Sequence, residues 1–279
     1  MKDESGNYDD KRIQNVIVFL GADHKVGTSM ICRMIGESLS KNKDTKILML
    51  CFDGTVGMDY TRANSAIKGM DDYKAKMTNN ILSSKDFMNI CREDESLYFM
   101  KGCESMIKSK YYFPNDIYNF LNILSTLFDI LLVDVGSSIE LGMAIGGLKA
   151  GGKVVLVTDQ KEKSFKRYGA MKNEILCKLN IPIDHMIVNK IFRSREFQDP
   201  EILAVNYQCD LLGQIEYSEQ GLYAELEKSS LLNFKDSQIN ESIEGIRKKI
   251  EDYLGIERQT DKTNKKINIK KYFLKKGWI

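Results

Sequence analysis

A short apolar segment, residues 16–20, runs into a turn that contains glycine and then into a segment with helical spacing. A strand, turn and helix in this order restrict the possible folds, because the turn's amides and the helix N-terminus form a site for anions. In the standard phosphate-binding pattern, Gly-x4-Gly-Lys-Ser/Thr, the lysine reaches the β- and γ-phosphates and the hydroxyl binds Mg²⁺. We expect Gly21, Gly27 and Ser29 to fit this pattern, whereas Thr28 stands where the lysine belongs.

The loop therefore keeps its backbone cradle and lacks one cation. We assign nucleotide binding to seven of its residues: Gly21, His24, Lys25, Val26, Gly27, Thr28 and Ser29. Lys25 can supply a displaced cation, and a solvated loop lysine is the alternative interpretation. His24 is interpreted as a loop residue, because a lone histidine without a carboxylate partner in the pattern gives little support for a catalytic base.

Apolar segments alternate with segments of helical spacing along the chain. The apolar ones are typical of parallel strands covered on both faces, and we predict strands at 13–20, 46–52, 96–100, 129–135, 153–158, 183–189 and 211–215. We predict helices at 28–41, 115–126, 164–178, 199–206 and 238–254. This alternation predicts an α/β fold with a doubly wound, mostly parallel sheet, in which ligands bind at the carboxyl ends of the strands. Segment 60–95 gives the weakest pattern.

Two of the predicted strands end in an aspartate. Asp134 follows one apolar run and Asp53 follows another. Together with Ser29, the two carboxylates would make a site for a metal ion and a water molecule. Each has a structural alternative: a strand-end Asp134 that caps the next helix, and an Asp53 that only shapes the turn before Gly54.

Taken in order over nearly the whole chain, these motifs resemble the MinD/ParA class of P-loop ATPases. The resemblance implies that Ser29 binds Mg²⁺, that Asp134 is the Walker B acid, and that Asp53 is a switch I acid beside the attacking water. It also implies that Asn189 recognises adenine. We count Asn189 and the adjacent Lys190 among the nucleotide-binding residues, with ATP and Mg²⁺ as the cofactors.

The chain departs from that class at three positions. The signature lysine aligns with Asp23, the loop lysine with Thr28, and an earlier switch I acid with Cys51. Phosphoryl transfer depends on positioning and charge stabilisation, and removal of one preorganised donor typically costs ~3 to 4 kcal/mol. Because two cations are missing, we expect hydrolysis to be slow or absent. We still expect Mg-ATP to bind, since the backbone amides, the helix dipole and Mg²⁺ remain.

Threonine in place of the loop lysine resembles the atypical TadZ/CpaE branch. This implies a nucleotide-dependent homodimer that positions or scaffolds a Tad-type pilus or secretion apparatus, with proteins of that machinery as partners. The alternative is a partition-type ParA ATPase that acts on DNA. A third possibility, an iron–sulfur reductase or metal-insertion protein, is disfavoured because no paired cysteines lie near the switch II segment.

Charge is distributed unevenly. The net charge is +2, and residues 261–279 hold seven lysines against one aspartate, so this end carries +6 and the remainder of the chain −4. A mildly acidic body makes DNA an unlikely partner, since non-specific DNA binding relies on lysine and arginine at backbone phosphates. The lysines are mixed with large apolar residues, which can bind an anionic membrane surface; a disordered or core-docked tail is the alternative.

The sequence predicts three parts: a flexible N-terminus at 1–11, a nucleotide-binding domain at 12–255 and a basic, aromatic tail at 256–279. No apolar run approaches the ~18 to 20 residues needed to cross a bilayer. The six cysteines are scattered, which suggests neither a zinc site nor a disulfide framework. We expect a cytoplasmic protein, peripheral at the inner face of the membrane or at the cell pole if the tail binds lipid.

Overall fold

A twisted, eight-stranded sheet forms the centre of the computed structural model, which describes residues 11–57, 68–87, 90–92 and 95–256. The strand order is β3-β4-β2-β5-β1-β6-β7-β8. All neighbouring pairs are parallel except β3 and β4. The strands are β1 Ile13–Gly21, β2 Ile47–Cys51, β3 Cys91–Arg92, β4 Leu97–Met100, β5 Ile130–Asp134, β6 Gly151–Thr158, β7 His185–Ile191 and β8 Asp210–Glu216.

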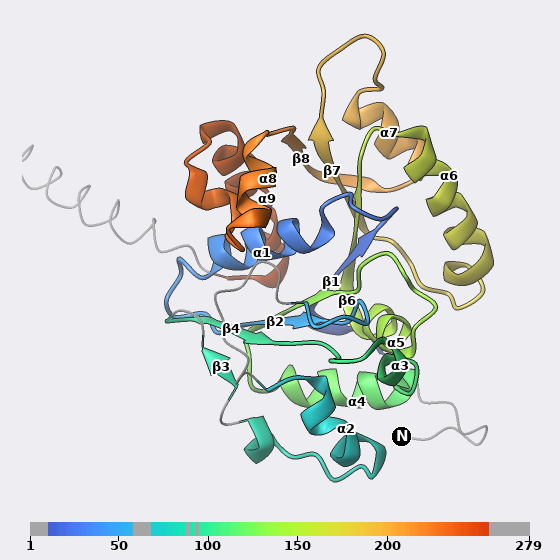
Figure 1. The fold of residues 1–279 in the computed structure, drawn as a ribbon, viewed down its shortest axis with the longest axis vertical. Coiled ribbons are helices and arrows are strands. Elements are labelled where there is room, and N and C mark those ends of the chain that lie inside the picture. The colour runs from blue at the N-terminus through green and yellow to red at the C-terminus, as the bar shows by residue number, and fades with distance from the viewer. Residues whose placement is uncertain (1–10, 58–67, 88–89, 93–94, 257–279) are drawn as a thin grey trace, which may run out of the picture.

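Helices cover both faces of the sheet (Figure 1). Helices α1, α8 and α9 pack on one face, and α2, α4, α5, α6 and α7 pack on the other. The helices are α1 Thr28–Leu39, α2 Met70–Thr78, α3 Met106–Ser109, α4 Pro114–Leu124, α5 Gly142–Ala150, α6 Glu162–Met171, α7 Pro200–Tyr207, α8 Gln220–Leu226 and α9 Ser237–Leu254. Short 3₁₀ turns occupy Ser84–Phe87 and Leu231–Phe234, and a π-helical turn occupies Lys172–Leu176.

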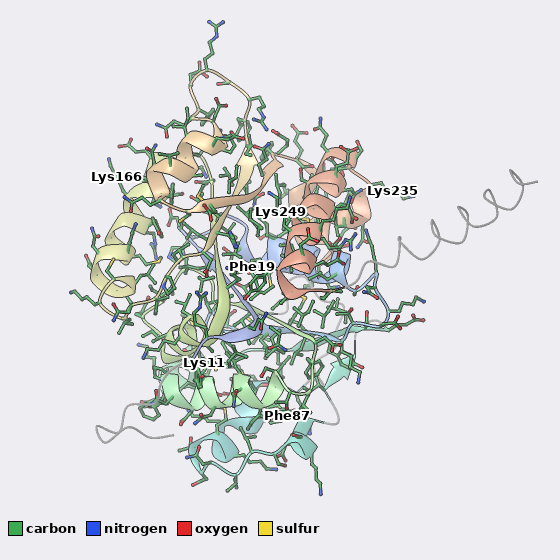
Figure 2. All side chains as sticks on the ribbon, turned by 180° about the vertical axis from the view of Figure 1, so that it is seen from behind. Lys11, Phe19, Phe87, Lys166, Lys235 and Lys249 are labelled. Carbon is green, nitrogen blue, oxygen red and sulfur yellow. The ribbon has the colours of Figure 1, made fainter. Side chains whose placement is uncertain are left out.

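The central strand β1 shows why the sheet needs helices on both sides. Val16 and Val18 belong to one apolar cluster, whereas Ile17 and Phe19 belong to the other, and all four are at most 1% exposed. Figure 2 shows Phe19 inside the molecule. Successive side chains of a strand point to opposite faces, so a strand that is apolar at every position must be covered twice.

All seven predicted strands and all five predicted helices are present, which confirms the doubly wound α/β fold. The predicted helix 164–178 begins earlier, at Glu162, and gives way to the π turn after Met171. Helix α5 was not predicted, because its three glycines hide the helical pattern. They permit close packing: a Cβ on Gly146 would lie 2.6 Å from the Ile117 Cβ of α4.

The parallel arrangement brings the carboxyl ends of β1, β2, β5, β6 and β7 to one edge. In the sheet register, Asp134 at the end of β5 lies beside Phe19 of β1 and Cys51 of β2.

The predicted N-terminal segment, apart from residue 11, and the basic tail, apart from residue 256, lie outside the described residues, as does part of segment 60–95. Within the described part, no helix is both long and apolar enough to cross a membrane.

Candidate functional site

The turn between β1 and α1 is built around Gly27. This residue caps α1 with a φ of 96°, in the left-handed region that favours glycine. A Cβ at this position would lie 2.4 Å from the Nδ2 of Asn189, so a side chain is excluded by contact as well as by backbone strain. The carbonyl of Gly27 accepts the first bond of the helix from the Ile31 N–H at 3.0 Å. The predicted phosphate cradle at the start of α1 is therefore present as a backbone shape.

Gly21 serves this turn in a different way from that expected. The standard pattern places its first glycine five positions before the second, where this chain has Ala22. Gly21 lies one position earlier, and its N–H donates to the Gly136 carbonyl at 2.7 Å. A Cβ on Gly21 would approach the Thr28 Oγ1 to 2.6 Å. Gly21 thus permits close packing of the loop, and its amide already donates to the turn that follows β5.

Ser29 and Asp134 lie together beneath the loop. Asp134 is 7% exposed, and its carboxylate accepts hydrogen bonds from the Ser29 hydroxyl and from the Gly136 N–H, the latter at 3.0 Å. Burial and the nearby charge of Asp53 raise the pKa of Asp134 to about 6, although both hydrogen bonds act in the opposite direction. The structure therefore joins the predicted magnesium hydroxyl and the predicted Walker B acid.

Two interpretations of Asp53 were predicted, an acid of the metal site and a residue that only shapes a turn, and the structure agrees with features of both. Its Oδ1 accepts hydrogen bonds from the Thr55 N–H at 2.8 Å and the Thr55 hydroxyl at 2.7 Å, which makes it the first residue of a turn. The Cys51 thiol lies 3.1 Å from the same oxygen. Asp53 also lines the cavity in front of the loop, and it is packed so closely that a Cβ on Gly136 would lie 2.7 Å from its own Cβ. Both strand-end acids therefore meet at one edge.

A cavity of about 330 Å³ opens in front of the loop, and Lys25 is the one lysine or arginine among its described lining residues: Asp23, His24, Lys25, Gly27, Thr28, Ser29, Asp53, Thr55, Met106, Gly136, Ser137 and Ser138. Lys25 is exposed. The His24 Nδ1 lies 2.8 Å from the Ser137 hydroxyl, so it joins the loop to the segment after β5 and has no carboxylate partner there.

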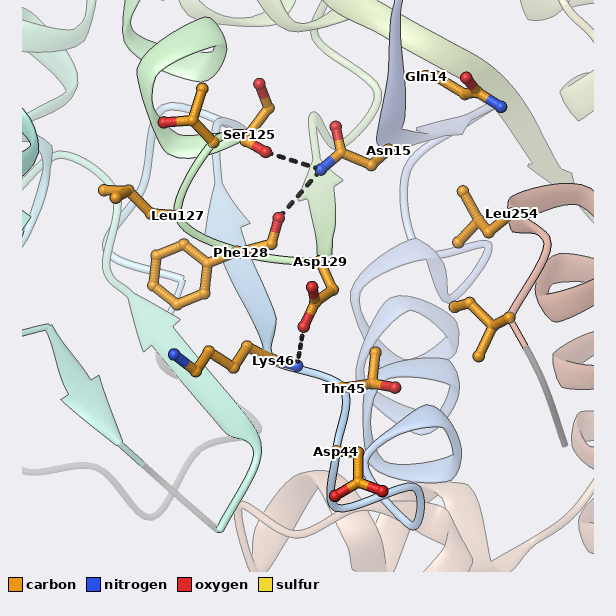
Figure 3. Close-up of a pocket in the computed structure, with 12 residues that line it drawn as sticks. Gln14, Asn15, Asp44, Thr45, Lys46, Ser125, Leu127, Phe128, Asp129 and Leu254 are labelled. Atoms are coloured by element: carbon orange, nitrogen blue, oxygen red, sulfur yellow. Dashed lines mark hydrogen bonds between the residues drawn. The ribbon is translucent and has the colours of Figure 1, made fainter. Parts of the chain in front are cut away.

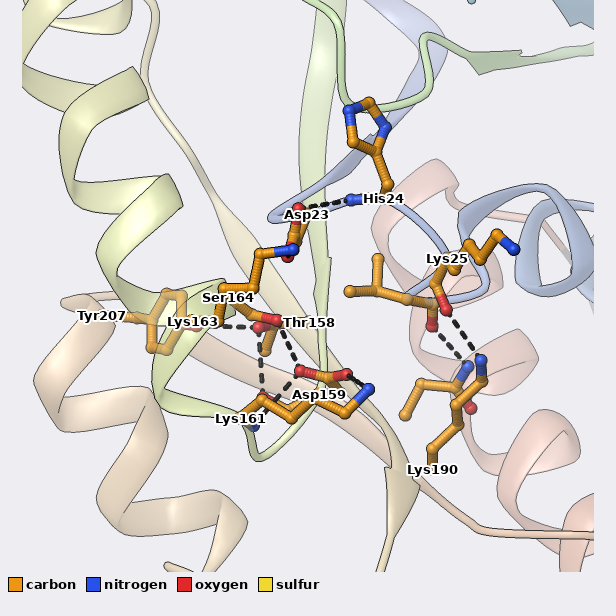
Figure 4. Close-up of polar contacts among 12 residues, drawn as sticks. Asp23, His24, Lys25, Thr158, Asp159, Lys161, Lys163, Ser164, Lys190 and Tyr207 are labelled. Carbon is orange, nitrogen blue, oxygen red and sulfur yellow. Dashed lines mark hydrogen bonds and ion pairs between the residues drawn. The ribbon is translucent and has the colours of Figure 1, made fainter.

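Asn189 and Lys190 hold the loop from the opposite side. The Asn189 amide donates to the Val26 carbonyl at 2.8 Å, and the Lys190 ammonium donates to the Lys25 carbonyl at 2.7 Å (Figure 4). Burial lowers the pKa of Lys190. Both residues also line a second cavity of about 240 Å³, which shares the lining residue Gly27 with the first. The two residues thus support the loop, a role that sequence reasoning missed because more than 160 residues separate the partners.

Asp23, at the position of the signature lysine, is buried and points towards helix α6 (Figure 4). Its carboxylate accepts from the His24 N–H at 2.8 Å. It also lies 3.4 Å from the Lys163 ammonium and 3.5 Å from the Nε of Arg167. Sequence reasoning identified Asp23 but not these two cations, which belong to a helix about 140 residues further along the chain.

The donor set fits Mg²⁺. The hydroxyl of Ser29 and the carboxylates of Asp53 and Asp134 are hard oxygen ligands, which this ion prefers. The described residues contain no group of three or more histidine, cysteine or acidic side chains arranged to hold a metal. Such a site suits an ion that keeps several waters and takes its other ligands from substrate phosphates.

Neither a protein-family model nor a curated protein sequence matches this chain. Solved structures do resemble it. The septum site-determining protein MinD of Pyrococcus horikoshii OT3, complexed with Mg-ADP, has a TM-score of 0.72 at 17% identity, covering 88% of this chain and 99% of that one. A ParA family ATPase of Chlorobium tepidum TLS has a TM-score of 0.71 at 18% identity, covering 84% and 98%. A putative plasmid partition protein of Borrelia burgdorferi B31, bound to AMPPNP, has a TM-score of 0.63 at 18% identity, covering 85% and 97%. The chain therefore has the fold of the MinD and ParA ATPases.

Proposed function

We propose that the chain binds Mg-ATP in the two cavities on either side of Gly27 and acts as a nucleotide-dependent positioning or scaffold protein. One observation carries the proposal. The Gly27 turn, the Ser29 hydroxyl and the Asp53 carboxylate line one cavity, and Asp134 is hydrogen-bonded directly behind Ser29. Three solved structures of this fold hold Mg-ADP, AMPPNP or ATP, which supports a nucleotide as the ligand.

Each cavity suits one part of the nucleotide. The phosphates would lie in the cavity below the Gly27 turn, against the N-terminus of α1, whose dipole favours anions. The base would lie in the second cavity, where Asn189 already donates one hydrogen bond to Val26 and keeps its carbonyl oxygen for a donor on the base. A bound Mg²⁺ would supply positive charge beside the phosphates. Ser29, Asp53 and Asp134 would hold it, and Asp53 would orient a water molecule.

We expect hydrolysis to be slow or absent. The loop has Thr28 in place of the lysine that normally reaches the phosphates, and Lys25 is exposed. A missing preorganised donor typically lowers turnover by about 10²–10³-fold. Binding should tolerate this loss better than catalysis does. The amides of the turn and the ion would still contact the phosphates, and the helix dipole would still attract them. A binding protein with little turnover is therefore the better supported form of the proposal.

The positioning role rests on the fold and on the loop sequence. One structure of this fold is a MinC and MinD complex of Aquifex aeolicus, which supports recruitment of a partner protein. Thr28 in the loop supports the finer assignment to a TadZ/CpaE-like scaffold for a Tad-type pilus or secretion apparatus, acting as a homodimer at the membrane or pole. The Borrelia structure keeps a partition role on DNA in view. A gel shift at low and high salt separates the two, because only a partition protein retards DNA.

Calorimetry of the full chain with ATP, in Mg²⁺ and in EDTA, tests the nucleotide site. We expect binding in Mg²⁺ and weaker binding without it. Ser29→Ala should remove the difference between the two conditions, since the hydroxyl acts through the ion. Ser194→Ala, on an exposed loop, is the matched control and should bind as the wild type does. Absence of binding by the wild type in Mg²⁺ would overturn the proposal, and turnover of about 1 s⁻¹ or faster would contradict slow hydrolysis.

A further inference from the structure

A group of three charged side chains joins the nucleotide loop to helix α6. Asp23 lies on the loop with its side chain 7% exposed, and it lines the phosphate cavity. The Lys163 and Arg167 side chains, which lie 3.4 and 3.5 Å away, are 78% and 38% exposed. A carboxylate buried beside a site for anions is unfavourable twice, through desolvation and through repulsion of the ligand. This arrangement therefore needs a compensating positive charge.

We propose that Lys163 and Arg167 neutralise Asp23 and so set the affinity of the loop for polyphosphates. Helix α6 thereby supplies positive charge from outside the loop, whose standard lysine position holds Thr28. Asp23 lines the cavity and alone would contribute −1 there, whereas the two cations beside it bring the net charge of the group of three to +1. The inference rests on the proposed nucleotide function, and it gives the phosphate site a positioning pair from another part of the fold.

The protonation state of Asp23 supports this arrangement. Burial alone would raise the pKa of the carboxyl, but the His24 N–H, Lys163 and Arg167 together hold the pKa below its ordinary value. Asp23 is therefore ionised at neutral pH, and its charge cannot be removed by protonation when an anion binds. The two cations of α6 are what remains to compensate for it.

Helix α6 is arranged so that these two cations reach Asp23. Lys163 and Arg167 are four residues apart and so lie on one face of the helix. Its other cations at this end have acids of their own: Lys161 lies 2.9 Å from Asp159, and Lys166 lies 2.6 Å from Glu162. The helix is also fixed in place.

Two contacts anchor α6. The Ser164 hydroxyl donates to Asp159 at 2.6 Å (Figure 4), and Tyr168 is 3% exposed in the core. A fixed helix keeps the Lys163 and Arg167 stems close to the loop, so less entropy is lost when they pair with Asp23. Exposed ion pairs alone contribute little, which makes the buried member, Asp23, the residue that decides the effect.

Calorimetry with ATP, ADP and adenosine tests the inference on the full chain. We expect the double variant Lys163→Gln/Arg167→Gln to bind Mg-ATP about tenfold or more weakly, with a smaller loss for ADP and none for adenosine, which has no phosphate. Asp23→Asn should tighten ATP binding, because it removes the repulsion and frees both cations. The triple variant should regain most of the affinity that the double variant loses. Lys166→Gln, on the same helix, is the matched control and should leave all three ligands unaffected.

Several outcomes would overturn the inference. The double variant would bind ATP as tightly as the wild type if the two cations had no influence on the phosphates. Equal losses for ATP and adenosine would indicate a structural disturbance, as would failure of Asp23→Asn to restore affinity in the triple variant. Thermal unfolding of each variant identifies a loss of fold directly. If the wild type binds no ATP at all, the proposed function fails. If the wild type binds ATP normally and only the variants behave otherwise than expected, this inference alone fails.

Discussion

The two edges of the central sheet both carry cavities, but they differ in what their polar groups do. The cavity at the amino edge is the larger, with about 770 Å³ against about 330 Å³ at the phosphate loop. In the amino-edge cavity, Asn15 donates to the carbonyls of Ser125 and Phe128, both at 3.0 Å (Figure 3). Asp129 accepts from the Lys46 N–H at 2.7 Å. These side chains connect strand ends and loops to one another.

At the carboxyl edge, charged groups face one another instead. Asp53 and Asp134 are close enough for their charges to interact, and Gly27 holds a backbone shape that a side chain would prevent. The comparison teaches that cavity size alone does not identify the cavity that we propose as the ligand site. A ligand site is marked by acids, amides and a helix N-terminus that converge on one place, and doubly wound sheets build such sites at the carboxyl ends of their strands.

The largest expected effect comes from a side chain on Gly27. Gly27→Val puts a Cβ 2.4 Å from the Asn189 Nδ2 and forces a β-branched residue to a φ of 96°. We expect a loss of nucleotide affinity of about 100-fold or more, since the turn must open or shift to accept the side chain. Calorimetry with Mg-ATP measures this loss. Gly245→Ala, where a Cβ meets nothing within 4 Å, should bind normally, and normal binding by Gly27→Val would show that the turn is not the phosphate cradle.

The next largest effect is expected at the amino edge, where a substitution of Asp184 should lower the stability of the fold and leave nucleotide binding unchanged. Burial alone would raise the pKa of Asp184, but hydrogen bonds from Arg12 and the Val154 N–H, with the charges of Arg12 and Lys153, hold it below its ordinary value. We expect Asp184→Asn to lower the free energy of unfolding at pH 7 by about 2 kcal/mol. Denaturant titration measures this, and Asp210→Asn, at an exposed site, is the control.

The pH dependence gives the sign of this contribution. Because the pKa of Asp184 is lower in the folded chain than in the unfolded one, its stabilisation is fully present above a pH of about 4 and is lost as the pH falls through the folded pKa. The difference between the wild type and Asp184→Asn should therefore shrink in acid. A stability difference that stays constant between pH 7 and pH 3 would contradict the role given to the Asp184 carboxylate. Weakened Mg-ATP binding by Asp184→Asn would show that the amino edge also affects the nucleotide site.

The smallest effect is expected from Asn15. Asn15→Ala removes two hydrogen bonds between its amide and the carbonyls of Ser125 and Phe128, which should cost about 1 kcal/mol of stability. Mg-ATP affinity should not change, because the residue lies at the edge away from the loop. Gln14→Ala, an exposed neighbour that lines the same cavity, is the control. A nucleotide that bound in the amino-edge cavity would show itself as a loss of affinity in either variant.

The sequence predicted a large part of the fold and the edge of the sheet at which the candidate site residues lie. Apolar runs such as residues 16–20 need cover on both faces, so their alternation with helical segments was sufficient to predict the parallel sheet. The sheet then brings strand-end acids to one edge, which is why Asp53 and Asp134 could be paired from sequence alone. Helix α5 escaped prediction because its glycines serve contacts with α4 that no local pattern reveals.

What the sequence determined by itself is therefore the fold class, the turn at Gly27 and the edge at which a ligand would bind. These follow from local chemistry, namely periodicity, glycine and strand-end acids. Only the tertiary structure decided which side chains meet: Lys190 with the Lys25 carbonyl, Asn189 with Val26, and Asp23 with helix α6. Such contacts join segments more than 130 residues apart, and their energies depend on distances and burial, which no spacing in a linear chain specifies.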